Sequence, residues 1–173
     1  MTATATPPLL TSLLGNSQRL DGGAMFGNAP KSLWSRFCPA DAENRIALAC
    51  RSLLVEVADR RILLEAGIGA FFSPPLKSRF GVVETEHVLL RSLAAVGLSD
   101  ADITDVVLSH LHFDHAGGTV RDDSGTSCLN FPKATYHLQR RHWKWAHQAT
   151  DKDRGSFRPE DFAPLEKSGQ LHL

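Results

Sequence analysis

Apolar and polar positions alternate along two neighbouring stretches of the chain, and this alternation predicts a pair of strands. Residues 46–57 read IALACRSLLVEV and residues 61–66 read RILLEA, each with partly alternating apolar side chains. A period of two is typical of strands, because successive side chains point to opposite faces. A turn at Asp59 and Arg60 would join the two runs, and Gly67 and Gly69 end the second. We therefore predict an antiparallel hairpin.

A helical spacing follows, and then a short apolar run. Residues 84–96 carry apolar side chains on one face of a helix, and Gly97 supplies a C-terminal stop. Residues 103–110, ITDVVLSH, have an unbroken apolar centre, which favours a strand buried on both faces. The other segments predict six further elements. We expect a strand interrupted by bends over 19–34, a Pro-containing loop over 70–83 and a strand over 133–138. After these we expect a helix over 140–148, a polar loop over 149–164 and the start of a strand over 169–173.

This order of strands and helices predicts one layered α/β (α+β) domain over residues 1–173. Residues 1–18 are expected to be a flexible lead-in to it. The domain is expected to be incomplete, since the last predicted strand has no element after it to pack against.

Composition and charge narrow the class of protein. The chain has 42% hydrophobic and 22% charged residues, with 19 basic and 19 acidic side chains, so its net charge is zero. A neutral chain without basic stretches argues against nucleic acid and anionic membranes as partners. No apolar run approaches a membrane span, and the N-terminus lacks the basic start of a signal peptide, so we expect a cytoplasmic protein. Three cysteines without a CxxC pair argue against a disulfide framework.

The stretch SHLHFDHAGG at residues 109–118 contains the residues that are candidates for metal binding. On an extended segment, His110 and His112 point the same way, so they can bind one ion together. Asp114 and His115 follow where the chain turns through glycines, and they would face a second position nearby. Imidazole and carboxylate suit Zn²⁺, with Fe²⁺ or Mn²⁺ as alternatives. Isolated histidines are usually surface or core residues, but four ligand-type residues at this spacing indicate a metal site.

The motif resembles the HxHxDH signature of the metallo-β-lactamase superfamily, and the hairpin, helix and strand before it fit the same family. The resemblance implies an αββα sandwich with a metal site at one edge, of which this chain would supply the N-terminal half to two-thirds. Residues 22–34, GGAMFGNAPKSLW, and residues 39–56 are similar to the branch that contains lactonase-like and methyl-parathion-hydrolase-like enzymes.

By that resemblance, His110 and His112 would bind the first of two zinc ions, and Asp114 and His115 the second. A metal-bound hydroxide, with Asp114 as a catalytic residue, would attack an ester, lactone or related bond of a small-molecule substrate. The alternatives are another hydrolase of this fold (thioesterase, phosphotriesterase or β-lactamase), or a truncated or degenerate fragment without catalysis.

The remaining family ligands are expected outside this chain. His172 lies in an apparent strand and is not expected to be a ligand. With four ligands instead of the usual seven, we expect the chain alone to be inactive or nearly so. A homo-oligomer or a complementing second half would be its protein partner.

Two further features bear on the site. Family members carry an Asp two residues before a glycine at the end of the second hairpin strand, where this chain has Glu65. Glu65 is expected to orient a metal-binding side chain, the alternative being a solvent-exposed strand end. Five aromatic residues precede the motif in loops and would either line an apolar pocket or cover the core: Trp34, Phe37, Phe71, Phe72 and Phe80.

Overall fold

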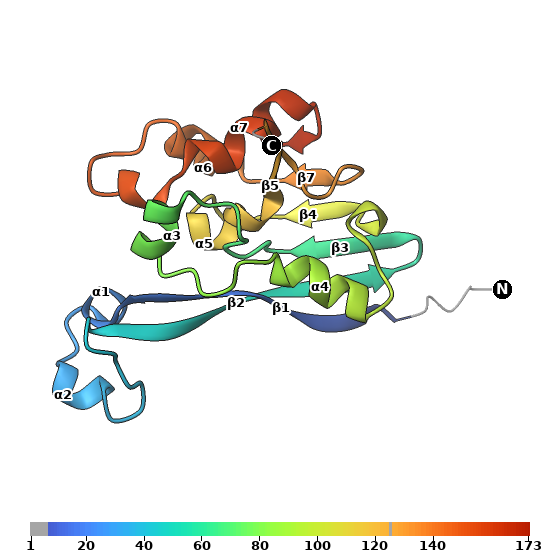
Figure 1. Cartoon of the computed structure of the whole chain (residues 1–173). Coiled ribbons are helices and arrows are strands. Elements are labelled where there is room, and N and C mark those ends of the chain that lie inside the picture. Colours follow the sequence, from blue (N-terminus) through green and yellow to red (C-terminus); the bar gives the residue numbers. More distant parts are fainter. Residues whose placement is uncertain (1–6, 125) are drawn as a thin grey trace.

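The computed structural model describes residues 7–124 and 126–173, and its central element is a six-stranded sheet in the order β1-β2-β3-β4-β7-β8 (Figure 1). The first three strands run antiparallel, and β3, β4, β7 and β8 run parallel. A separate two-stranded hairpin, β5–β6, joins Val120–Asp123 to Thr126–Leu129. The predicted mixed α/β class is confirmed.

The predicted hairpin is confirmed as β2 (Arg45–Val57) and β3 (Arg60–Leu64), although its turn lies one residue earlier, at Ala58 and Asp59. The flexible lead-in is wrong from Leu9 onward. Residues 9–21 form β1 (Leu9–Asp21), which pairs along the length of β2, while residues 1–6 lie outside the described residues. The long partner strand supplies the hydrogen bonds that stabilise this otherwise weak strand sequence.

The strands after the hairpin are shorter than predicted. They are β4 (Asp105–Val107), β7 (Thr135–His137) and β8 (Leu171–His172). The terminal strand does have a neighbour, since β8 pairs in parallel with β7.

Two predicted helices are confirmed with later starts or earlier ends, as α4 (Val88–Ala95) and α6 (Arg140–Ala146). The predicted loops over 70–83 and 149–164 are wrong in part, because they contain α3 (Pro74–Arg79) and the start of α7 (Pro159–Ser168). Both helices begin with proline, whose fixed φ suits a first helical turn. The bends predicted over 19–34 include two short helices, α1 (Gly22–Phe26) and α2 (Lys31–Trp34).

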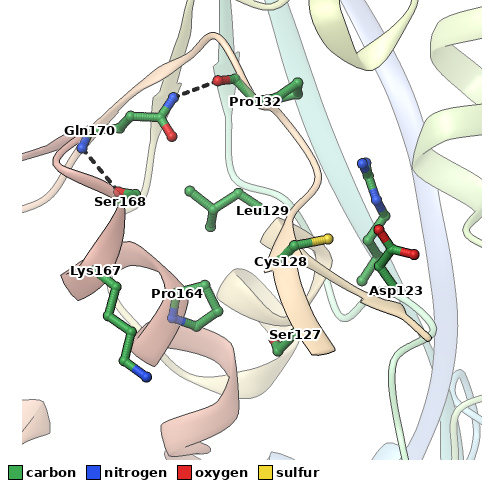
Figure 2. A pocket seen from close by; sticks show the side chains of 10 residues that line it. Asp123, Ser127, Cys128, Leu129, Pro132, Pro164, Lys167, Ser168 and Gln170 are labelled. Carbon is green, nitrogen blue, oxygen red and sulfur yellow. Dashed lines mark hydrogen bonds between the residues drawn. The ribbon is translucent and has the colours of Figure 1, made fainter. Parts of the chain in front are cut away.

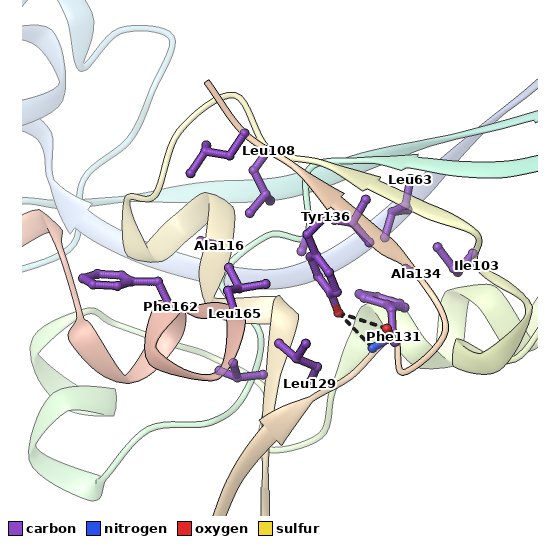
Figure 3. Packing of buried hydrophobic residues seen from close by; sticks show 14 of the residues in the cluster. Leu63, Ile103, Leu108, Ala116, Leu129, Phe131, Ala134, Tyr136, Phe162 and Leu165 are labelled. Atoms are coloured by element: carbon purple, nitrogen blue, oxygen red, sulfur yellow. Dashed lines mark hydrogen bonds between the residues drawn. The ribbon is translucent and has the colours of Figure 1, made fainter. Parts of the chain in front are cut away.

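The core lies between one face of the sheet and the helices. Leu54, Leu63, Val106 and Tyr136 are partners in register across four adjacent strands, and all four are buried. Side chains of α4 and α7 pack in the same cluster, and Figure 3 shows Phe162 and Leu165 of α7 beside the sheet. The Tyr136 hydroxyl donates to the carbonyl of Phe131 and accepts from its amide, which satisfies the polar end of this buried ring (Figure 3).

A polar network lies at the start of β4. Asp105 is buried, with 4% of its surface exposed. Its carboxylate accepts hydrogen bonds from Nε and Nη2 of Arg60, from the Thr104 hydroxyl (2.7 Å) and from His137 Nε2 (2.8 Å). Burial alone would raise the pKa of Asp105, but these hydrogen bonds outweigh it and lower the pKa to about 2. The network ties the starts of β3 and β4 to the end of β7.

Among the described residues, no helix has the length and apolar character needed to cross a bilayer.

Candidate metal centre

The candidate site lies at the carboxyl ends of β3 and β4. Glu65 follows β3 directly, and the segment from Leu108 to His112 leaves β4 and leads into the short helix α5 (Phe113–Ala116). His112 is the residue before this helix, and Asp114 and His115 lie within it. Because parallel neighbours end at the same edge of a sheet, residues 44 positions apart in the chain meet here, as in the bond from the Ser109 amide to Glu65 Oε1.

All four predicted ligands gather at this edge. The ring centroid of His110 lies 4.5 Å from that of His112 and 4.0 Å from that of His115. Nε2 of His115 lies 3.7 Å from Oδ2 of Asp114. The side chains that the sequence motif singled out therefore share one small region, although they come from both sides of a helix start.

The four side chains are of the types that bind a divalent cation, but they are not arranged around one point. Three imidazoles and one carboxylate are the donors that zinc prefers in proteins. Ser109 Oγ lies 2.9 Å from Nδ1 of His110, and Glu65 engages Nδ1 of His115, so each ring has its Nε2 turned away from these contacts. Within residues 7–124 and 126–173, however, no three His, Cys, Asp or Glu side chains stand in ion-holding geometry. The donors are thus gathered but do not converge on one point.

Both carboxylate oxygens of Glu65 contact the segment that carries the predicted ligands. Oε1 accepts from the backbone amide of Ser109 (3.0 Å), and Oε2 lies 3.1 Å from Nδ1 of His115. The backbone of Glu65 is left-handed, with φ of 64°, which is uncommon outside glycine. Such strain persists only where surrounding contacts fix it, and it clusters at functional sites. Glu65 therefore orients His115 from a conformation that the fold maintains at a cost.

Electrostatics keep two of the imidazoles neutral. Burial, together with the neighbouring His115 and His112, lowers the pKa of His110 to about 4. Burial also lowers the pKa of His112, despite the charge of Asp114. The hydrogen bond to Glu65 raises the pKa of His115. Neutral rings present the lone pairs that a cation needs.

The glycines after α5 serve a close approach of two backbones. Gly117 and Gly118 were expected to permit a sharp bend, yet neither has a left-handed φ. Instead, the segment 66–68 lies directly against them: a Cβ added to Gly118 would stand 1.9 Å from the carbonyl oxygen of Ala66. The Gly118 amide donates to the carbonyl of Gly67 (2.8 Å), and the Ala66 amide donates to that of His115 (3.0 Å). This interlock fixes α5 against the end of β3.

Three neighbours of the site were not predicted from the sequence. Gln18 of β1 reaches Asp114, because Nε2 donates to Oδ2 at 3.5 Å. His142 of α6 accepts a hydrogen bond from the Leu111 amide through Nε2 (2.8 Å). Phe157 lies with its ring centroid 4.8 Å from that of His112. In the sequence, only the residue types of these three neighbours hint at such a role, because the tertiary fold brings them to the site.

The five aromatic residues divide among the core, a cavity and the surface. Trp34 is buried and stacks on Phe26, 4.9 Å between centroids, and Phe80 is buried against Phe113. Phe37 is 72% exposed. Phe71 and Phe72 line a cavity of about 520 Å³ together with Arg158. His172, as expected, is no part of the cluster; it is exposed on β8, beside His137.

A separate hollow of about 440 Å³ lies between β6 and α7, and Figure 2 shows Cys128 and Pro164 on its walls. Gln170 closes one end of this hollow by donating to the carbonyl of Pro132 (2.8 Å). None of the four predicted ligands lines it. We therefore place the candidate chemistry at the histidine cluster and not in this hollow.

A comparison with family models gives a match over part of the chain. Residues 45–121 match the model of the metallo-beta-lactamase superfamily, and this range contains Glu65 and all four predicted ligands. The matched segment is similar to a metallo-beta-lactamase superfamily domain. The relatives described below are named as probable metal-dependent hydrolases, so the chain is similar to enzymes of that kind.

Individual relatives agree with this match. A protein described as a probable metallo-hydrolase from Mycobacterium tuberculosis is 27% identical over 158 residues, covering 80% of this chain and 48% of its own length. The N-acyl homoserine lactonase AttM of Azorhizobium caulinodans is 35% identical over 65 residues, covering 38% of this chain and 21% of its own length.

Among solved structures, the crystal structure of a probable metal-dependent hydrolase from Staphylococcus aureus matches with a TM-score of 0.85 and 30% identity. This match covers 98% of this chain and 60% of the other. The chain spans about half the length of the curated metallo-hydrolase that it matches over most of its residues.

The role of Glu65 gives a first testable prediction. Replacing it by glutamine keeps the shape but leaves only one acceptor oxygen for two donors, the Ser109 amide and His115 Nδ1. We expect Glu65→Gln to weaken Zn²⁺ binding by roughly 10- to 100-fold, the usual effect of losing a group that orients a ligand. Competition with a chromophoric chelator measures this affinity. Glu166→Gln, the same change at an exposed position of α7, should leave it unaltered. Equal affinity in Glu65→Gln and the unmodified chain would remove the orienting role.

Proposed function

We propose that this domain is the metal-binding part of a hydrolase that cleaves an ester or lactone of a small molecule. The observation that carries the proposal is the gathering of three imidazoles and one carboxylate beside a glutamate that orients one of them. A divalent cation there would be held by His110, His112, Asp114 and His115, with Zn²⁺ favoured by the donor types. Such a cation supplies an ionised water near neutral pH and polarises a carbonyl.

The chain's own residues prepare this chemistry in three ways. The interlock at Gly118 holds α5 against the end of β3, which fixes where Asp114 and His115 stand. Burial keeps His110 and His112 unprotonated. Glu65 holds the proton of His115 on Nδ1 and thereby directs Nε2 toward Asp114.

The substrate class rests on two supports. The neutral net charge and the absence of basic stretches disfavour a polyanionic substrate. The 35% identity with a named N-acyl homoserine lactonase favours a lactone or ester over a phosphodiester. The relative's match is restricted to 65 residues, so the substrate is proposed as a bond type and not as one compound.

The experiment measures metal binding by the chain first. Zn²⁺ affinity is determined by chelator competition for the unmodified chain, for the double variant His110→Ala/His112→Ala, and for His147→Ala. His147 is exposed, and its ring contacts lie outside the cluster. We expect the double variant to lose about 100-fold in affinity, because two of four donors are gone. The His147 variant should match the unmodified chain.

Because the chain alone is expected to be nearly inactive, the reaction type is tested with Zn²⁺-loaded protein together with a complementing second half, on a panel of an N-acyl homoserine lactone, an aryl ester, a phosphotriester and a phosphodiester. Turnover of the lactone or ester that the double variant lacks would support the proposal. Phosphodiester cleavage alone would overturn the substrate class. Equal Zn²⁺ affinity in the double variant would overturn the metal site.

A further inference from the structure

The β1 strand approaches the histidine cluster through an irregularity in its pairing with β2. The register of the two strands shifts between Leu14 and Ser17, which is the signature of a β-bulge. Before the shift, Leu13 points into the core; after it, the buried positions are Asn16 and Gln18. Strict alternation from Leu13 would instead have buried position 17 and left Gln18 outside. The bulge therefore turns Gln18 inward.

The inward position places an amide beside a predicted metal ligand. Gln18 is 2% exposed, and its Nε2 donates to Oδ2 of Asp114 at 3.5 Å. The other end of the amide, Oε1, is buried without a hydrogen-bond partner. A flipped amide would set Oε1 against the carboxylate, where two acceptors face each other with no proton between them. The orientation of Gln18 is thus dictated by Asp114.

A buried acceptor without a partner is unfavourable for folding, and few native side chains carry one. An apolar side chain of similar length would fill the same space without that penalty. Asn16, the other buried polar residue after the bulge, contrasts with Gln18 because both ends of its amide are used: Nδ2 donates to the Glu86 carbonyl (2.7 Å) and Oδ1 accepts from the Val88 amide (3.0 Å). Asn16 serves the fold, whereas the contact of Gln18 serves Asp114.

We propose that Gln18 is a positioning residue for the metal site: by occupying Oδ2 of Asp114, its amide fixes the carboxylate rotamer so that Oδ1 is presented to the cation. The inference rests on the proposed role of Asp114 as a ligand. It adds a contact from an edge strand 96 residues away, outside the HxHxDH loop.

The test uses Gln18→Met, which keeps the length of the side chain and removes both the donor and the unpartnered acceptor. We expect its Zn²⁺ affinity to fall about tenfold. Its urea unfolding midpoint without metal should equal or exceed that of the unmodified chain, because the orphaned oxygen is gone. This split separates positioning from structure, since a purely structural glutamine would lose stability and keep its affinity.

A double-mutant cycle completes the test. Asp114→Asn alone should lower Zn²⁺ affinity, and Gln18→Met should add little in that background, because the contact it removes no longer orients a carboxylate ligand. If Gln18→Met lowers affinity equally in both backgrounds, or leaves it unchanged, the positioning role is overturned while the metal site stands. If the unmodified chain and Asp114→Asn bind Zn²⁺ equally, the proposed ligand role of Asp114 fails, and the positioning role fails with it.

Discussion

Gly118→Ala is expected to destabilise the domain by about 3 kcal/mol or more and to weaken metal binding at the same time. The added Cβ would meet the backbone carbonyl oxygen of Ala66 at 1.9 Å, and no side-chain rotation can relieve a clash with backbone. Overpacking a well-packed site costs about 1–3 kcal/mol, and this contact belongs at the upper end of that range or beyond it. Separation of the two segments would break the hydrogen bond from the Gly118 amide to Gly67.

Urea unfolding followed by circular dichroism measures the loss, and chelator competition measures the change in Zn²⁺ affinity. Gly155→Ala is the matched control, because a Cβ there would find its nearest atom, in the Arg79 side chain, at 3.8 Å and the position has no left-handed φ. The control should stay within about 0.5 kcal/mol of the unmodified chain. A Gly118→Ala variant as stable as this control would show that the two backbone segments can move apart at little cost in free energy.

Asp105→Ala is expected to destabilise the domain by about 3 kcal/mol at pH 7. The substitution leaves His137 and Arg60 without their common acceptor, and loss of one partner of a buried charged pair typically costs about 3–5 kcal/mol. The lower end applies because the Arg60 side chain is 52% exposed and can turn to water. Asp151→Ala provides the control. Its carboxylate is 91% exposed and also pairs with an arginine, so its removal should have little effect.

The Asp105 effect carries its own pH dependence. The pKa of this carboxyl in the folded protein, about 2, lies below its ordinary value of 3.8. The stabilisation by the ionised form is therefore complete above about pH 4 and is lost as the pH falls toward 2. The shift corresponds to roughly 2 kcal/mol. The stability difference between the unmodified chain and Asp105→Ala should shrink by about that amount across this window. A difference that stays constant from pH 5 to pH 2 would contradict the assigned pKa.

Sequence patterns predicted the elements whose side chains repeat at a regular spacing. The hairpin of β2 and β3 and the helix α4 follow directly from such repeats. The first strand escaped detection because its irregular apolar pattern, broken by the bulge at residues 15–16, shows no clean period of two. Helix α7 escaped because Pro164 lies inside it, although Pro159 at its start and Gly169 at its end are ordinary helix boundaries.

The candidate site was predictable where its residues are neighbours in sequence. The HxHxDH spacing brought four side chains to one edge, and the glutamate after β3 was recognised from its place before Gly67. Gln18 and His142 carry no such local signal, because a bulge and a helix start bring them to the cluster. Their roles follow only from the pairing of strands and the packing of helices, which a single sequence does not specify.

The contacts around Asp114 and His115 also constrain the order in which the molecule is assembled. One partner lies 96 residues upstream, on the first strand, and another 50 residues upstream, directly after the third. Contacts between residues so far apart in the sequence form late in folding, after formation of the sheet has removed much of the chain's conformational entropy. A cation bound at the proposed site would therefore enter a scaffold that has already folded, unlike the ion of a zinc finger, whose capture drives folding itself. Newly made protein can mature before it encounters any metal, and loading can be a separate, later event.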